Sequence, residues 1–252
     1  KVLSMILVLA MLLSLMSMSA FTMATNETGA SSSARNDFMR VFHLDCGRKY
    51  FSVAEIKSLI DTASAANYTH IELAVGNDSL RFLLDDMSVT ANGKTYASDD
   101  VKTQIHNGNV NYYDAGSANE LSQSDMDTII AYAQSKNISI IPLINTPGHM
   151  DAILGAATSL TGSDCAYNKS VRTIDLTNDT AVAFTQALLQ KYINYFAGKG
   201  CGYFNMGADE YANDVLKPNG FSYLLSNGLY NNFVNYVNDV AKLIVDAGMT
   251  PI

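Results

Sequence analysis

Two adjacent carboxylates, Asp209 and Glu210, are the residues of this chain best suited to do chemistry. They follow a short apolar stretch, residues 203–206, and are followed by Tyr211. Hydrolases that cleave a bond with two carboxylates hold them on opposite sides of it, and successive side chains of a strand point to opposite faces. Neighbouring acids are therefore badly placed to flank one bond. If the chain is an enzyme, the second reactive group must come from elsewhere, and the substrate itself is one candidate.

Polar residues also follow three other apolar runs. The pairs are Asp45 and Arg48 after residues 39–44, Asn77 and Asp78 after residues 70–75, and Asn145 and His149 after residues 138–144. Each pair has a structural interpretation: an Arg48–Asp45 ion pair, turn chemistry at Asn77-Asp78, and a helix cap at His149. Because the same arrangement recurs at four strand ends, we expect these side chains to meet at one functional rim.

The four apolar runs alternate with amphipathic helices, which predicts parallel strands joined by helical crossovers. Capping boxes at Ser52 and Ser122 start two of the helices, and two more are expected over residues 179–196 and 230–246, the last closed by Gly248. A loop of about 45 residues follows the second run, and loops of that length are usually functional. We predict a (β/α)8 TIM barrel, truncated to about the first four βα units and the start of a fifth strand at residues 249–252. A doubly wound sheet is the alternative.

The composition limits the classes of function. The 252 residues are 48% hydrophobic and 16% charged, with a formal net charge of -8, so a folded core is expected and no basic patch for nucleic acid is present. No GxGxxG or GxxxxGK[ST] motif follows a strand, which disfavours a nucleotide cofactor. Metal catalysis is also disfavoured, because the chain has no HExxH and no DxDxDG motif. Its three cysteines have no CxxC spacing and are expected as buried thiols, with one bridge possible.

The N-terminus has the pattern of a secretory signal peptide. Residues 1–24 begin with Lys1, continue in a Met-rich apolar run and end in small residues, with cleavage plausible after Ala20 or Ala24. A membrane anchor is the alternative. Residues 25–37 are expected to be a linker, and residues 38–252 a partial catalytic barrel. A secreted or cell-surface location follows from the signal peptide.

Four segments in order resemble glycoside hydrolase family 20, the β-N-acetylhexosaminidases. They are residues 44–51 (LDCGRKYF), 76–82 (GNDSLRF), 145–150 (NTPGHM) and 207–210 (GADE). With residues 83–88 (LLDDMS), the second loop is most similar to bacterial surface exo-β-N-acetylglucosaminidases and lacto-N-biosidases. The resemblance extends from about residue 38 to the end and implies that the chain is the N-terminal part of the family's barrel.

The resemblance implies a role for each matching residue. Asp209 would orient the substrate's 2-acetamido group, and Glu210 would be the general acid and base. Arg48 would hold hydroxyls of the terminal sugar. His149 and Asn145 would lie near the acid, and Asn77 and Asp78 would contribute to the substrate site, although the family more often has Asp-Asp at this position.

The function implied is retaining hydrolysis of glycans with a terminal β-linked N-acetylhexosamine or lacto-N-biose, through an oxazolinium intermediate and without a cofactor. The alternative is a carbohydrate-binding or adhesion module without turnover, or an inactive fragment. The family's pocket is completed by Trp and Tyr residues of later strands, and this chain has no Trp. We therefore expect the present half of the pocket to bind sugar poorly. The oligomeric state is left open by the sequence.

Overall fold

The computed structural model describes residues 38–110, 119–215 and 221–252. Residues 39–252 form one compact unit. The predicted signal peptide and linker lie outside the described residues, so both stay predictions. Among the described helices, none has the length and apolar character needed to cross a membrane.

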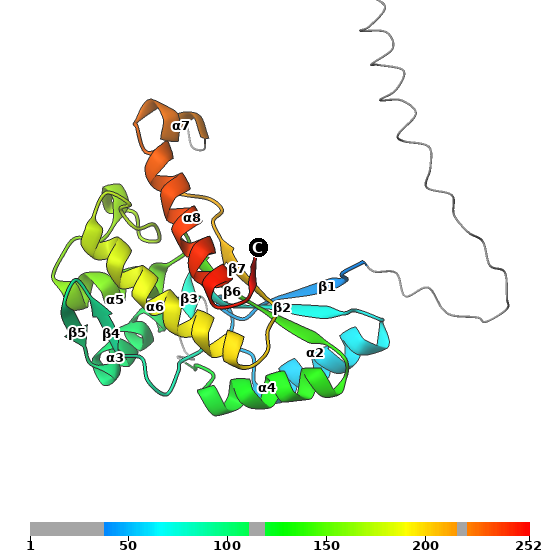
Figure 1. Ribbon diagram of the computed structural model, residues 1–252. Coiled ribbons are helices and arrows are strands. Elements are labelled where there is room, and N and C mark those ends of the chain that lie inside the picture. The colour runs from blue at the N-terminus through cyan, green and yellow to red at the C-terminus, as the bar shows by residue number, and fades with distance from the viewer. Residues whose placement is uncertain (1–37, 111–118, 216–220) are drawn as a thin grey trace, which may run out of the picture. The chain divides into compact units, whose positions relative to one another are not determined.

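A parallel sheet organises the unit (Figure 1). Its strands pair in the order of the chain: β1 (Val41–Asp45), β2 (His70–Asn77), β6 (Ser139–Thr146), β7 (Tyr203–Gly207) and β8 (Thr250–Pro251). A doubly wound sheet would reverse the strand order at a switch point, whereas a barrel adds each new strand beside the previous one. The order therefore agrees with the predicted barrel and its first four βα units, followed by the start of a fifth strand.

The helices that connect the parallel strands are α2 (Val53–Ala65), α4 (Gln123–Ser135), α6 (Asp179–Gly198) and α8 (Tyr230–Asp246). Helix α2 packs beside α4, and α6 beside α8 (Figure 1). Both predicted capping boxes are present: Ser52 pairs with Glu55 and Ser122 with Asp125, each side chain bonding to the other residue's amide. At the end of α8, Gly248 adopts a left-handed φ of 83° directly after the cap residue. These local signals set the directions in which the chain leaves and re-enters the sheet.

The predicted 45-residue loop is wrong as a description, because most of the described part of this segment has secondary structure. It contains β3 (Ser79–Leu80), the hairpin β4 (Val89–Ala91) with β5 (Lys94–Tyr96), and α3 (Ser98–Asn109). Asn92 and Gly93 form the hairpin turn with φ values of 51° and 76°, which suits a short two-residue connection. Strands this short carry too little periodicity to be recognised from sequence.

Three further helices were not predicted: α5 (Asp151–Thr161), the 3-10 turn Tyr167–Lys169 and α7 (Phe221–Ser226). Helix α5 begins directly after His149 and packs against α3 and α6. Its cap residue is Met150, so the cap interpretation of His149 is wrong. Small residues dominate this helix, and Gly108 of α3 lies so close that an added Cβ would be 2.7 Å from the Ala152 Cα.

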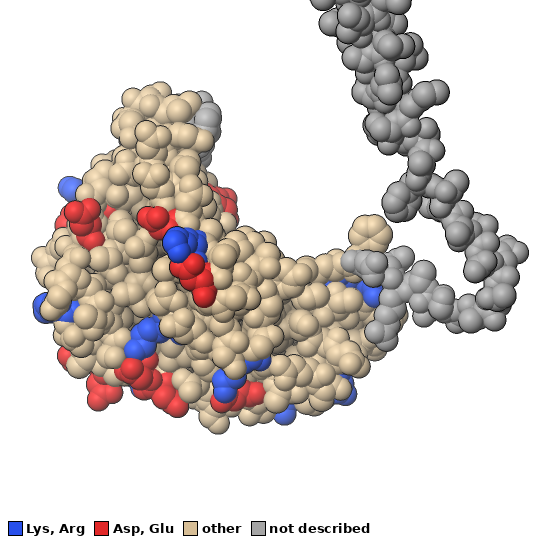
Figure 2. All heavy atoms as spheres, viewed as in Figure 1, with Lys and Arg blue, Asp and Glu red and all other residues tan. Residues whose placement is uncertain are grey.

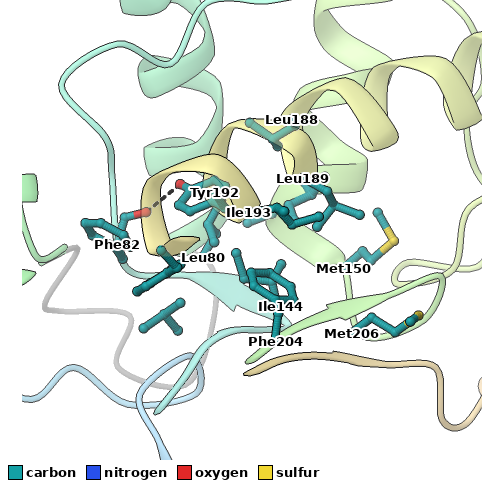
Figure 3. Packing of buried hydrophobic residues seen from close by; sticks show 14 of the residues in the cluster. Leu80, Phe82, Ile144, Met150, Leu188, Leu189, Tyr192, Ile193, Phe204 and Met206 are labelled. Carbon is teal, nitrogen blue, oxygen red and sulfur yellow. Dashed lines mark hydrogen bonds between the residues drawn. The ribbon is translucent and has the colours of Figure 1, made fainter. Parts of the chain in front are cut away.

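The core lies between the sheet and the helices. Figure 3 shows Leu188, Leu189, Tyr192 and Ile193 of α6 above Ile144 and Phe204 of the sheet. The Tyr192 hydroxyl donates a 2.6 Å hydrogen bond to the Phe82 carbonyl, which ties α6 to the segment after β3. Burial of this kind supplies most of the driving force that holds the strand ends in place.

The three cysteines, Cys46, Cys165 and Cys201, are buried free thiols, as predicted, and the bridge left open by the sequence does not form. Burial raises the pKa of the Cys201 thiol to about 12, so it is not a reactive nucleophile. On the face drawn in Figure 2, basic and acidic side chains are interspersed and separated by uncharged residues.

Candidate active site

A cavity of about 340 Å³ lies at the carboxyl ends of β1, β2, β6 and β7. It is lined by His43, Arg48, Asn77, Leu143, Asn145, His149, Asn205, Gly207, Asp209 and Glu210. Six of the seven predicted site residues are in this set, and the seventh, Asp78, lies behind it with a fully buried side chain. The structure therefore brings all four predicted strand ends together, as expected for parallel strands.

A chain of hydrogen bonds runs from the cavity into the protein. Glu210 Oε2 lies 3.0 Å from His149 Nε2, and His149 Nδ1 lies 2.8 Å from Asp78 Oδ1. Exposure falls along the chain, since the Glu210 side chain is 56% exposed, that of His149 4%, and that of Asp78 0%. One end can thus meet a ligand while the other end is held away from solvent.

The partners of His149 Nδ1 determine where the imidazole carries its proton. Arg48 Nη2, 3.3 Å away, can only donate, and the ionised Asp78 can only accept. Because the Asp78 contact is shorter, Nδ1 carries a proton and donates a hydrogen bond to Asp78. If His149 is neutral, its Nε2 is an acceptor, and the hydrogen bond requires a protonated Glu210. If His149 is charged, Nε2 donates to an ionised Glu210. The His149–Glu210 pair therefore shares one proton, which suits Glu210 to act as an acid and then as a base.

The surroundings favour the charged form of His149. The hydrogen bond to Asp78 is the largest influence and raises the pKa of the imidazole, while burial opposes it. The negative charges of Asp78 and Asp209 and the bond to Glu210 raise it further. The raised pKa favours a protonated imidazole beside the Glu210 carboxyl group.

Arg48 has a second ionic partner besides Asp45, the one that the sequence suggested. Arg48 Nε donates to Asp78 Oδ2 at 2.7 Å, whereas its Nη1 lies 3.8 Å from Asp45. Asp45 also accepts from the amides of Gly47 and Arg48 and, at 2.9 Å, from Asn77 Nδ2. The Arg48–Asp45 pair is therefore present but is the longer of two ion pairs, and through Asp78 the guanidinium joins the chain that leads to Glu210.

Left-handed backbone conformations shape both loops of the site. Asp78 and His149 have φ values of 60° and 52°, and the Asp78 amide donates to the His149 carbonyl at 2.6 Å. Such conformations are unfavourable for residues with a Cβ and cluster at functional sites. The contact between the two backbones fixes the spacing of the Asp78 and His149 side chains.

The turn after β7 places both acids at the cavity. Gly207, Ala208 and Glu210 have φ values of 74°, 63° and 49°. The strand ends at Gly207, so the alternation of a strand does not apply to Asp209 and Glu210. The expectation that they point to opposite faces is therefore wrong, because both line the same cavity.

Asn145 and Asn77 support this turn from the neighbouring strands. Asn145 is buried and donates to Asn77 Oδ1 at 3.5 Å. A Cβ added at Gly207 would lie 1.9 Å from Asn145 Oδ1. Asn145 thus occupies the space that only a glycine leaves free.

Sequence reasoning missed a polar layer beneath the site. Glu72 accepts from Asn205 Nδ2 at 2.7 Å and contacts His43 Nδ1 at 2.7 Å, and Asn205 Oδ1 accepts from the Gly207 amide at 2.8 Å. The available signal was a polar residue inside each of three otherwise apolar runs, namely His43, Glu72 and Asn205. Through Gly207, this layer holds the turn that carries Asp209 and Glu210.

The described residues that line the cavity are mainly polar. Leu143 is its one apolar side chain, and the acidic members are Asp209 and Glu210. In residues 38–110, 119–215 and 221–252, no group of three or more His, Cys, Asp and Glu side chains is arranged to hold a metal ion. The arrangement offers a proton donor, a carboxylate beside it and a guanidinium, all suited to a hydroxylated or amide-bearing ligand.

Comparison with known proteins identifies the relatives of this site. Residues 38–244 match the family described as glycosyl hydrolase family 20, catalytic domain. The structure is similar to a catalytic module of the pneumococcal exo-β-D-N-acetylglucosaminidase StrH, with 46% identity and a TM-score of 0.80 over 84% of this chain and 52% of that chain. The chain therefore spans about half the length of this relative.

Two further relatives agree with this result. The Lacto-N-biosidase of Bifidobacterium bifidum is 33% identical over 90 residues, which cover 36% of this chain and 8% of that protein. The β-N-acetylhexosaminidase from Streptomyces coelicolor is 20% identical, with a TM-score of 0.60 over 84% of this chain and 38% of that chain. At that identity the likeness concerns the fold alone.

Proposed function

The chain belongs to glycosyl hydrolase family 20, and from this premise we propose that its protein hydrolyses the bond that joins a terminal β-linked N-acetylhexosamine or lacto-N-biose to a glycan. The hydrogen-bonded chain Glu210–His149–Asp78, next to Asp209 in one cavity, is the observation that carries the proposal. A neutral, hydroxyl-rich substrate also suits the polar lining and the absence of any basic run.

The proposed mechanism assigns different roles to the two neighbouring acids. Glu210 protonates the glycosidic oxygen and later activates water, because its proton is shared with His149. A retaining hydrolase with two catalytic carboxylates holds them about 5 Å apart on opposite sides of the bond, and family 20 enzymes are exceptions to this scheme. The acidic side chains of the described lining are neighbours on one turn, so the acetamido oxygen of the substrate supplies the nucleophile. Asp209 orients that group and stabilises the oxazolinium intermediate.

Substrate-assisted hydrolysis makes Glu210→Gln and Asp209→Asn the informative variants. In the full protein, we expect Glu210→Gln to lower kcat/KM on a chromogenic β-N-acetylglucosaminide or lacto-N-bioside by about 10²–10⁴. Asp209→Asn should retain binding but slow formation of the intermediate, and a thiazoline mimic of that intermediate should inhibit the unmodified protein.

Asp239→Asn is the matched control, because it removes one negative charge from an exposed position of α8. Full activity in Glu210→Gln would contradict the role of Glu210. If the thiazoline fails to inhibit and Asp209→Asn is unimpaired, substrate assistance is wrong. Sugar binding without any turnover would favour the alternative of a binding module.

A further inference from the structure

We infer that Asp151 shares a proton with Asp78 and is a positioning residue that sets where the His149–Glu210 pair holds its proton. This inference rests on the proposed function for its catalytic consequence, although the sharing itself is independent of turnover. Asp151 is not among the predicted site residues, and it does not line the cavity.

Backbone contacts bring Asp151 against Asp78. Asp151 is the first residue of α5, two positions after His149. The Asp78 amide donates to the His149 carbonyl, and the Asp78 carbonyl accepts from the Ala152 amide at 2.9 Å. Asp78 is thereby fixed to the residues on both sides of Asp151, and their two carboxyl groups meet in a side-chain hydrogen bond.

Few donors face the Asp151 carboxylate, and its own backbone amide is one of them. Its Oδ2 is buried and has no hydrogen-bond partner among the described residues. Arg172 Nη2 is 3.9 Å from Oδ1, which is beyond hydrogen-bonding distance. Two ionised carboxylates at this place would offer acceptors only. A proton on Asp151 converts one of its oxygens into a donor toward Asp78, whose side chain is fully buried.

Opposing charges act on Asp151, and the protonated form is favoured. Burial is the largest influence and the charge of Asp78 the next, and together they raise the pKa of Asp151 to about 6. The Arg172 guanidinium and the backbone amide of Asp151 itself act in the opposite direction.

Three charged residues on elements packed against α5 have partners elsewhere. His106 of α3 contacts Glu120, and Lys191 of α6 pairs with Asp86. Arg81, which follows β3, donates from Nε to the Gly47 carbonyl. Asp78 and Arg172 are therefore the charged side chains that decide the protonation of Asp151.

The consequence for catalysis follows from the charge of the carboxyl pair. While Asp151 is neutral, the Asp78–Asp151 pair carries one negative charge. That charge is on Asp78, whose oxygens bond to Arg48 and His149. When Asp151 ionises, a second negative charge appears near the imidazole and draws the shared proton from Glu210 to His149. Glu210 then loses its acid form, so Asp151 sets the upper pH limit of the acid-competent state.

Carboxyl and imidazole titrations by NMR test this inference on the full chain. We expect the Asp151 carboxyl carbon, assigned through its backbone, to titrate near pH 6, about two units above an ordinary aspartate. The His149 resonance, assigned with His149→Gln among the four histidines, should show an inflection at the same pH. Asp151→Asn keeps a donor toward Asp78 but cannot ionise, so this inflection should disappear. In the active protein, the alkaline limb of kcat/KM should move to higher pH.

Asp164→Asn is the matched control, because Asp164 lies in the loop after α5 and accepts from the Ala166 amide, outside this network. Titration of Asp151 below pH 5, or a His149 inflection that persists in Asp151→Asn, would overturn the inference. If the Asn variant does not fold, the titration of the unmodified Asp151 decides alone. Coupled titrations without hydrolysis of a glycoside would contradict the proposed function only. Hydrolysis without coupled titrations would contradict only the proton sharing.

Discussion

Replacing Gly207 by alanine tests whether the turn after β7 is built as the structure indicates. The substitution adds one methyl group at a residue with a φ of 74°, and the new Cβ would lie 1.9 Å from Asn145 Oδ1. Because Asn145 is buried and contacts Asn77, it cannot move aside without cost. The turn, the neighbouring strand end and the two acids at the cavity should all be affected.

The expected loss of stability has separate contributions. A left-handed conformation costs a residue with a Cβ about 1–2 kcal/mol. Forcing Asn145 from its rotamer costs about 0.5–1.5 kcal/mol, and the weakened contact with Asn77 adds less, because 3.5 Å is long for a hydrogen bond. We expect Gly207→Ala to lower the free energy of unfolding by about 2–3 kcal/mol. For a domain of this size, that loss corresponds to a fall in Tm of about 5–10 °C.

Ala208→Gly is the matched control, because Ala208 is also left-handed, with a φ of 63°. A glycine there removes a penalty of about 1–2 kcal/mol but adds freedom to the unfolded chain worth about 0.4–1 kcal/mol. The net change should stay within about 1 kcal/mol of the unmodified protein. Urea and thermal unfolding of the three proteins measure both effects. Equal stability of Gly207→Ala and Ala208→Gly would refute the reasoning, because it would mean that Asn145 does not occupy the space beside Gly207.

Two further predictions concern the support of the site and the start of the chain. Asn205→Ala removes the bonds to Glu72 and to the Gly207 amide, so we expect a loss of about 1–2 kcal/mol in urea unfolding together with slower turnover, whereas Asn194→Ala on the exposed face of α6 should change neither. Equal stability and turnover of the Asn205→Ala and Asn194→Ala variants would contradict this prediction. In a secreting bacterial host, N-terminal sequencing should find a new terminus after Ala20 or Ala24, and retention of Lys1 would rule out the signal peptide.

The positions of the strands were predictable because each appears as a short apolar run, and the central strands β2 and β6 are largely buried on both faces. Their polar ends then identified the site, since the carboxyl ends of parallel strands share one edge. This is why Arg48, Asn77, His149 and Glu210 were found from four distant segments. The family motifs added roles to positions that the strand pattern had already selected.

The segments that the sequence did not reveal lack these signals. The hairpin β4–β5 has strands of three residues, and α5 is rich in small residues and has no side-chain cap. The left-handed backbone of Asp78 and His149 could not be read from residue type, because both are ordinary residues with a Cβ. The pairing of Asp151 with Asp78 depends on that backbone and was therefore missed.

The same backbone feature explains how two neighbouring acids reach one cavity. In a continuing strand, Asp209 and Glu210 would face opposite sides of the sheet. The left-handed residues Gly207 and Ala208 end the strand first, and the polar layer beneath holds the Gly207 amide in place. Both carboxylates consequently line the cavity from one turn, and they are the two carboxylates of the described lining. Under the proposed substrate-assisted mechanism, the nucleophile is the acetamido oxygen of the substrate. We therefore expect a sugar with a hydroxyl in place of the 2-acetamido group to bind without being cleaved, and hydrolysis of such a sugar would contradict the proposed mechanism.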